Sequence, residues 1–179
     1  MSQLRIVGGQ WRSRRLRVAE VPGLRPTPDR VRETLFNWLG QDLDGWACLD
    51  LFAGSGALGF EAASRGAAQV VLLERDPRAF AQLQQNADLL GGEALHCRKG
   101  DAEQYLRATG DRFDVIFLDP PFRQDWLARV EPLLPRVMAA GGCVYVEAES
   151  EVPELAGLRA VKTAKAGQVH YQLLRAEQG

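Results

Sequence analysis

Residues 50–59 read Asp-Leu-Phe-Ala-Gly-Ser-Gly-Ala-Leu-Gly, and this stretch decides the fold. It joins an apolar segment, residues 47–52, to a helical pattern over residues 57–65, and its glycines have the spacing G-x-G-x-x-G. Glu74 ends the next apolar segment, about 20 residues further on, as in sites that bind an adenosine ribose. Glycines in such a turn let the backbone approach a nucleotide closely, while the acidic side chain reaches a ribose hydroxyl. The stretch therefore predicts an adenosine-binding loop after a parallel strand.

Strand and helix patterns alternate after this loop. Further strands are expected at residues 70–74, 95–98, 113–118 and 143–148, the last opened by Gly141-Gly142, and helices at 77–90, 102–108 and 126–138. Pro132 and Pro135 should kink or split the last helix. Residues 159–164 and 169–175 favour a closing hairpin. We predict an α/β, Rossmann-like fold with a mostly parallel seven-stranded sheet, helices on both faces and a C-terminal antiparallel hairpin.

The first 40 residues are expected to extend the same domain, which continues over residues 41–179. Strand patterns at 4–7 and 15–18 predict a small β-hairpin. A helix over 28–40 should follow, with Thr27 as its N-cap and Pro28 in its first turn.

The N-terminal segment is strongly basic. Residues 1–32 hold eight arginines and only two acidic residues, although the whole chain has a formal net charge of −1. A basic segment on an acidic body is typical of proteins that bind a polyanion, and the arginine fork suits phosphate. Trp11 could add a stacking face. The expected RNA-binding residues are Arg12, Arg14, Arg15, Arg25 and Arg30. A solvated hairpin without a partner remains the alternative.

The composition limits the classes of protein to which this chain can belong. The 179 residues are 46% hydrophobic and 25% charged, as in a single soluble domain. No apolar run is long enough for a membrane span, and the N-terminus lacks the core of a signal peptide. Cys48, Cys97 and Cys143 are widely spaced, which favours reduced, buried thiols over a metal site. We expect a cytoplasmic protein that binds no metal.

A second motif, Asp119-Pro120-Pro121-Phe122, follows the strand at 113–118. In open parallel sheets, ligands bind at the carboxyl ends of the strands, so this motif should lie beside the glycine loop. The Asp119 carboxylate and the Pro120 carbonyl can each accept one N–H of a nucleobase amine, and Phe122 can stack on a flipped base. A rigid turn with Asp119 capping local backbone is the structural alternative.

Asp50 bears on the choice of cofactor. Its charge would repel the pyrophosphate of a nicotinamide dinucleotide, and the loop lacks the Lys-Ser/Thr of a P-loop. It suits the ammonium and sulfonium groups of S-adenosylmethionine, which carries no phosphate. A nicotinamide oxidoreductase is therefore disfavoured.

Together these motifs resemble the RsmD family, the bacterial 16S ribosomal RNA guanine-N2 methyltransferases, which are class I S-adenosylmethionine-dependent enzymes. The resemblance extends to Gly8–Arg12, Leu24–Trp38 and Ala166–Val169, so it covers nearly the whole chain. Pro28 departs from the family, which commonly has a second threonine there. The resemblance implies methylation of a guanine amine in 16S rRNA, within the 30S subunit or an assembly intermediate, by a protein expected to be a monomer.

Candidate site residues follow from the motifs and the resemblance. The catalytic residues are expected to be Asp119, Pro120, Pro121 and Phe122. The cofactor-binding residues are expected to be Asp50, Phe52, Ala53, Gly54, Ser55, Gly56, Glu74, Arg75, Asp101 and Ala102. Two other functions stay open: an adenine-N6 methyltransferase of DNA or RNA, and a non-enzymatic, RNA-binding ribosome assembly factor.

Overall fold

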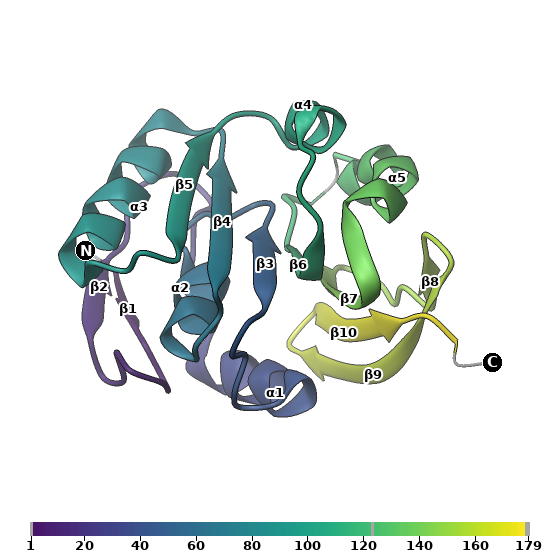
Figure 1. Cartoon of the computed structure of the whole chain (residues 1–179), viewed down its shortest axis with the longest axis horizontal. Coiled ribbons are helices and arrows are strands. Elements are labelled where there is room, and N and C mark those ends of the chain that lie inside the picture. The colour runs from purple at the N-terminus through teal and green to yellow at the C-terminus, as the bar shows by residue number, and fades with distance from the viewer. Residues whose placement is uncertain (1, 123, 178–179) are drawn as a thin grey trace.

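The structure, a computed structural model, describes residues 2–122 and 124–177. A twisted sheet forms its middle layer, and helices cover both faces (Figure 1). Buried apolar side chains form two separate clusters, one between the sheet and the helices on each of its faces. Such a three-layer arrangement explains why the central strands are apolar along their whole length.

The sheet runs in the order β5-β4-β3-β6-β7-β10-β9-β8. Strands β5 to β7 are parallel, while β10, β9 and β8 each pair antiparallel. Their bounds are β3 Ala47–Asp50, β4 Gln69–Glu74, β5 Leu95–Lys99, β6 Phe113–Leu118, β7 Met138–Ala148, β8 Glu154–Leu155, β9 Leu158–Ala166 and β10 Val169–Arg175. The predicted fold class is confirmed, with one strand more than the seven expected. The extra strand, β8, is too short to show an apolar pattern in the sequence.

Five α-helices cover the sheet in the described part of the chain. One face carries α1 (Asp29–Leu39), α2 (Ala57–Ser64) and α3 (Pro77–Leu90), and the other carries α4 (Ala102–Ala108) and α5 (Trp126–Val130). No helix among these residues is long and apolar enough to cross a membrane.

The segment after α5 corrects the helix predicted over 126–138. α5 ends at Val130, and two 3-10 turns, Glu131–Leu133 and Pro135–Val137, lead directly into β7. Each turn begins with a proline in its first two positions, where a missing N–H costs no internal hydrogen bond. The predicted split is confirmed, but β7 starts at Met138 and not at Gly141-Gly142.

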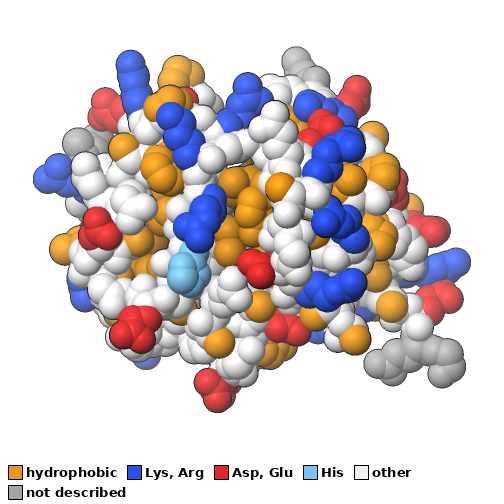
Figure 2. Space-filling view, turned by 45° about the horizontal axis from the view of Figure 1, so that its top comes forward, with side chains coloured by type: hydrophobic (Ala, Val, Ile, Leu, Met, Phe, Trp, Pro, Cys, Tyr) orange, Lys and Arg blue, Asp and Glu red, His pale blue; other side chains and the backbone are white. Residues whose placement is uncertain are grey.

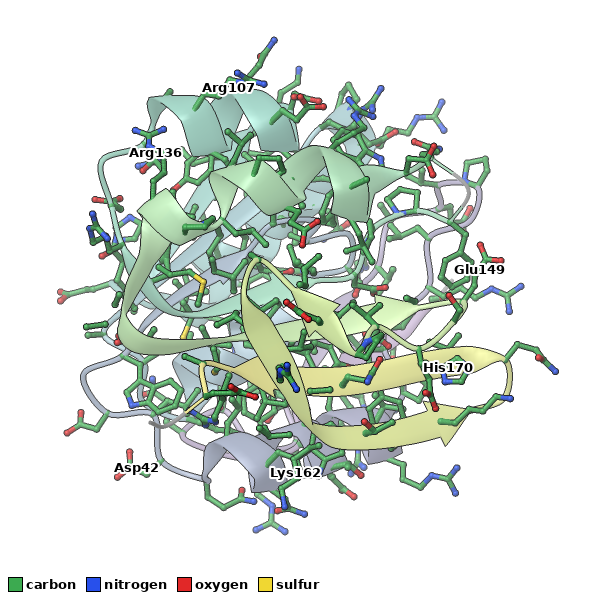
Figure 3. All side chains as sticks on the ribbon, turned by 90° about the vertical axis from the view of Figure 1, so that its right-hand side faces the viewer. Asp42, Arg107, Arg136, Glu149, Lys162 and His170 are labelled. Atoms are coloured by element: carbon green, nitrogen blue, oxygen red, sulfur yellow. The ribbon has the colours of Figure 1, made fainter. Side chains whose placement is uncertain are left out.

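Arg136, in the second of these turns, holds the end of α4. Its guanidinium donates to the carbonyls of Leu106 and Thr109, among the last of that helix, and Figure 3 shows it beside α4. Cations at a helix C-terminus satisfy carbonyls that have no partner within the helix. This contact joins the two elements that cover the second face.

The N-terminal segment forms a hairpin, β1 (Gln3–Arg5) and β2 (Arg15–Arg17), followed by α1. The hairpin packs beside α3, where Asn86 Nδ2 donates to Arg17 O at 2.9 Å. Trp11 is 9% exposed and contributes to the core, so the stacking role expected for it is wrong. Thr27 does not cap α1 either, because Pro28 is the N-cap residue and no side chain caps the helix.

Glu61, on α2, joins this segment to the sheet layer. Its fully buried carboxylate accepts from the N–H groups of Val7 and Gly8, both at 2.9 Å, and pairs with Arg32 and Arg65. Burial lowers the pKa of Arg32, and the Glu61 and Asp29 carboxylates oppose that shift. A buried cation is tolerated only when it is paired and hydrogen-bonded in this way.

Replacing Glu61 by alanine should therefore destabilise the protein strongly. The change leaves two buried guanidinium groups without this partner and should lower the free energy of unfolding by about 3–5 kcal/mol in urea titrations. The matched control is Arg159→Ala, which breaks the exposed Arg159–Glu177 pair and should cost about 0–1 kcal/mol. Equal losses in the two variants would contradict the role given to Glu61.

Candidate active site

A cavity of about 540 Å³ opens where β3, β4 and β6 end. The chain proceeds from β3 outward to β5 and then returns to β6 on the other side of β3, which makes this the switch point of the sheet. Open α/β sheets bind ligands at this position. Figure 2, which brings the top of Figure 1 forward, shows hydrophobic side chains in the middle of that face, with Lys and Arg side chains around them.

The glycine loop between β3 and α2 forms one wall of the cavity. Gly54 and Gly56 have φ angles of +56° and +85°, a region that favours glycine. A Cβ on Gly54 would lie 2.8 Å from the Leu24 side chain, which also lines the cavity, whereas one on Gly56 would lie 2.3 Å from the Phe60 ring. The two glycines therefore have different roles: Gly54 lies at the cavity, and Gly56 lets α2 start against the core.

Asp50 ends β3 at the floor of the cavity and is 2% exposed. Its Oδ2 accepts from Gly59 N at 3.0 Å. Burial is the main cause that raises the pKa of Asp50 to about 7; the Asp119 and Glu74 carboxylates raise it further, and the Gly59 N–H opposes them. A cationic group in the cavity would favour the ionised carboxylate.

Glu74 ends β4 and supports the glycine loop. Its two oxygens accept from Gly54 N and Asp76 N, both at 2.9 Å. A carboxylate oxygen has a second lone pair, so Glu74 can still accept from hydroxyls of a ligand in the cavity. The same side chain thus shapes the loop and lines the site.

The motif Asp119–Phe122 forms the opposite wall, at the end of β6. Asp119 is half-buried and Pro120 is buried, whereas Phe122 is 46% exposed at the cavity. Burial raises the pKa of Asp119, and a hydrogen bond with the Glu147 side chain opposes this shift. The arrangement offers an apolar ring and oxygen acceptors on one wall, which suits a planar group with N–H donors.

Most of the predicted site residues line this one cavity. They are Asp50, Phe52, Ala53, Gly54, Ser55, Glu74, Arg75, Ala102, Asp119, Pro120, Pro121, Phe122 and Arg25. Gly56 and Asp101 lie outside this lining. Asp101 instead caps α4, accepting from Gln104 N at 3.1 Å, while its neighbours Gly100 and Ala102 face the cavity.

The other predicted RNA-binding arginines lie elsewhere. Arg12 and Arg14 belong to the turn of the N-terminal hairpin, which binds the last turn of α2 through Gln10 N and Ser64 O, 2.8 Å apart. α2 starts at the cavity, and its eight residues span about 12 Å. This turn therefore lies at the end of the sheet away from the cavity, toward the bottom of Figure 1. Arg15 and Arg30 are exposed and do not line the cavity.

Several lining residues were not anticipated. Apart from Arg25, residues 21–28 were given no place in the site, yet they lie along the cavity, and Thr27 Oγ1 donates to Glu147 Oε2 at 3.4 Å. Glu147 is the last but one residue of β7, and Trp126 and Val169 complete the wall. An acidic residue at the end of an otherwise apolar strand was the one available signal for Glu147.

The cysteines lie away from this chemistry. Cys48 and Cys143 are buried and Cys97 is half-buried, and all three are free thiols. Burial raises the pKa of Cys97 and of Cys143 to about 11. Within residues 2–122 and 124–177, no group of three or more His, Cys, Asp or Glu side chains is arranged to hold a metal ion.

The strand order, the antiparallel β10 and the two loops that meet at the cavity define a class I methyltransferase. The chain belongs to the family described as Conserved hypothetical protein 95, whose model matches residues 4–175. This is the RsmD family, which the sequence motifs resemble. It is 44% identical over 182 residues to Ribosomal RNA small subunit methyltransferase D of Escherichia coli K12, covering 98% of this chain and 91% of that protein.

Solved structures agree with this assignment. A putative methyltransferase, yhhF, from Escherichia coli superposes with a TM-score of 0.88 at 43% identity, over 99% of this chain and 100% of that one. An RNA methyltransferase from Salinibacter ruber, in complex with S-adenosyl-L-homocysteine, superposes with a TM-score of 0.66 at 20% identity, over 86% and 95% of the two chains. The second likeness concerns the fold alone.

Proposed function

We propose that the protein transfers a methyl group from S-adenosylmethionine to the exocyclic N2 amine of a guanine in 16S rRNA, within the 30S subunit or an assembly intermediate. The observation that carries the proposal is that the Asp119–Phe122 motif and the glycine loop face each other across one cavity. The printed name of the Escherichia coli relative, a small-subunit rRNA methyltransferase, supports the substrate class. A ribosomal substrate also implies a cytoplasmic location.

The residues of the cavity fit S-adenosylmethionine. A volume of about 540 Å³ suits a ligand of this size. Gly54 has no side chain, so the backbone of the loop lies at the cavity wall and Leu24 can pack against it. Asp50 would attract the ammonium group, and Glu74 would accept from the ribose hydroxyls. The bound cofactor supplies an electrophilic methyl group. The Salinibacter ruber enzyme was solved with S-adenosyl-L-homocysteine, so the fold shared by the two chains can hold a ligand of this kind.

The motif after β6 would orient the accepting amine. Asp119 and the Pro120 carbonyl can each accept one N–H, which fixes the plane and direction of the amine. Proline at 120 and 121 removes two N–H donors and stiffens this loop. Phe122, exposed at the cavity, would stack on the base. Catalysis then rests on positioning and on stabilising the positive charge that develops on nitrogen.

Labelled methyl transfer to 30S particles that lack the modification tests this function. We expect label in 16S rRNA, recovered as N2-methylguanosine by nucleoside mass spectrometry and mapped to one position. Duplex DNA and free 16S rRNA serve as competing substrates. Label in N6-methyladenosine would favour the adenine alternative. No transfer to any of these substrates, from a protein that binds the cofactor, would favour the assembly-factor alternative.

Asp119→Ala should lower kcat by at least about 10²-fold, because it removes an acceptor and a negative charge beside the reacting nitrogen. The dissociation constant of the cofactor, measured by calorimetry, should stay within about threefold. Asp111→Asn, at an exposed position before β6, is the matched control and should retain activity. Turnover near the wild-type value in Asp119→Ala would remove Asp119 from the mechanism.

Cofactor affinity should depend on pH through Asp50. Only the ionised carboxylate attracts the ammonium group, and the pKa of Asp50 is raised to about 7, so affinity should fall as the pH falls. Between pH 8 and pH 6 the dissociation constant should rise about tenfold. S-adenosylhomocysteine is the suitable probe, because its amino group stays protonated over this range. Asp50→Asn should bind more weakly, with little dependence on pH; equal slopes in the two proteins would reject this role.

Neutralising the hairpin arginines tests whether the substrate reaches them. Replacing Arg12, Arg14 and Arg15 by glutamine should weaken 30S binding and flatten its dependence on salt, since fewer phosphates are neutralised. The matched control replaces three exposed basic residues of β9, Arg159, Lys162 and Lys165. Figure 3 shows Lys162 on β9, in the C-terminal hairpin. An unchanged salt slope in the first variant would reject a role for the hairpin.

A further inference from the structure

Glu147 lies beside Asp119 at the end of the sheet. Strands β6 and β7 are parallel, and their register pairs Leu118 with Val146. The residues that follow, Asp119 and Glu147, therefore leave the two strands at the same level, where both line the cavity.

The surroundings of Glu147 are nearly closed. The side chain is 6% exposed and accepts from Thr27 Oγ1, in the segment that runs along the cavity. It also shares a hydrogen bond with the Asp119 side chain. Two other titratable groups lie near Glu147. Tyr145 precedes it by two residues on β7, and Tyr171 is the register partner of Glu147 on β10. The Tyr145 hydroxyl is buried beside Glu147, and its interaction with the Glu147 carboxyl opposes the rise in the pKa of Glu147 without cancelling it.

Two carboxyl groups can share a hydrogen bond only when one of them holds a proton. No ion pair found among the described residues includes Asp119 or Glu147, so no cation there compensates a second negative charge. Burial raises the pKa of both groups, and the Asp119 charge raises the pKa of Glu147 further. The proton therefore belongs on Glu147, and Asp119 keeps its charge.

We propose that Glu147 is a positioning residue: its protonated carboxyl donates a hydrogen bond to one oxygen of Asp119 and leaves the other oxygen directed at the accepting amine. This inference rests on the proposed function of Asp119 as an acceptor. The Thr27 contact completes the arrangement, because Glu147 then donates with one oxygen and accepts with the other. A carboxylate that lacks this donor would be free to rotate, or to accept from backbone instead of substrate.

Glutamine mimics the protonated form of glutamate and is the decisive replacement. Its amide N–H can donate to Asp119 while its oxygen accepts from Thr27, so Glu147→Gln should keep kcat within about threefold. Glu147→Ala should lower kcat at least tenfold, with the KM for the cofactor within about threefold. Gln172→Ala is the matched control, since Gln172 is also buried; its side chain accepts from Val152 N, in the loop before β8, and donates to Thr163 Oγ1 on the neighbouring strand β9. It should lower thermal stability and leave kcat unchanged.

A second measurement does not depend on turnover. In the cofactor-free protein labelled with ¹³C at glutamate side-chain carboxyls, NMR should show one carboxyl that is still protonated at pH 7 and is missing in Glu147→Gln. An ionised Glu147 at pH 7, or a loss of kcat in Glu147→Gln as large as in Glu147→Ala, would overturn the proposal. Unchanged kcat in Glu147→Ala would do so too. Should the wild type transfer no methyl group at all, the proposed function fails, while the NMR result still decides the state of Glu147.

Discussion

The buried carboxylate of Glu61 is the contact on which the geometry of the site depends. It fixes the N-terminal segment on α2 through two backbone N–H groups and two arginines. Arg32, one of these arginines, also donates to the carbonyl of Thr27, so the same network holds the segment that runs along the cavity. Leu24 then lies against the glycine loop, and Thr27 contacts Glu147. An N-terminal segment that detached would take one wall of the cavity with it.

Five acidic residues line this cavity: Asp50, Glu74, Asp76, Asp119 and Glu147. Such a concentration of carboxylates is costly when it is buried, and it repels phosphate. Two devices reduce the cost. Backbone N–H groups stabilise Asp50 and Glu74, and a shared proton couples Asp119 with Glu147. The remaining field favours a cation, which explains why a glycine loop of the dinucleotide type suits a sulfonium-bearing ligand here instead of a pyrophosphate.

The structural features that could be predicted from the sequence are those set by residue patterns within one segment. Continuous apolar runs between helical patterns, glycine spacing and strand ends predicted the parallel sheet and the two loops that line the cavity. The features that could not be predicted depend on contacts between segments that are distant in the sequence. Thr27 looked like a helix cap but bonds Glu147, 120 positions away in the chain. Trp11 was expected to offer a stacking face, and Arg32 was counted among the arginines of the basic segment. Both are buried, because the core behind the hairpin packs against Trp11 and Glu61 pairs with Arg32. Charge counts cannot distinguish paired arginines from free ones.

The distribution of arginines places a condition on the substrate. Arg25 lines the cavity, whereas Arg12 and Arg14 belong to the hairpin turn that contacts the opposite end of α2. A single flipped nucleotide can contact only the first of these positions. Because α2 itself is buried, contact with both requires a polyanion that extends over the molecular surface from the cavity to the hairpin turn, as a folded RNA or a ribonucleoprotein surface can. Because Glu61 fixes the N-terminal segment on α2, it also fixes the position of the hairpin turn relative to the cavity. A substrate that contacts both basic regions must be large enough to span that separation.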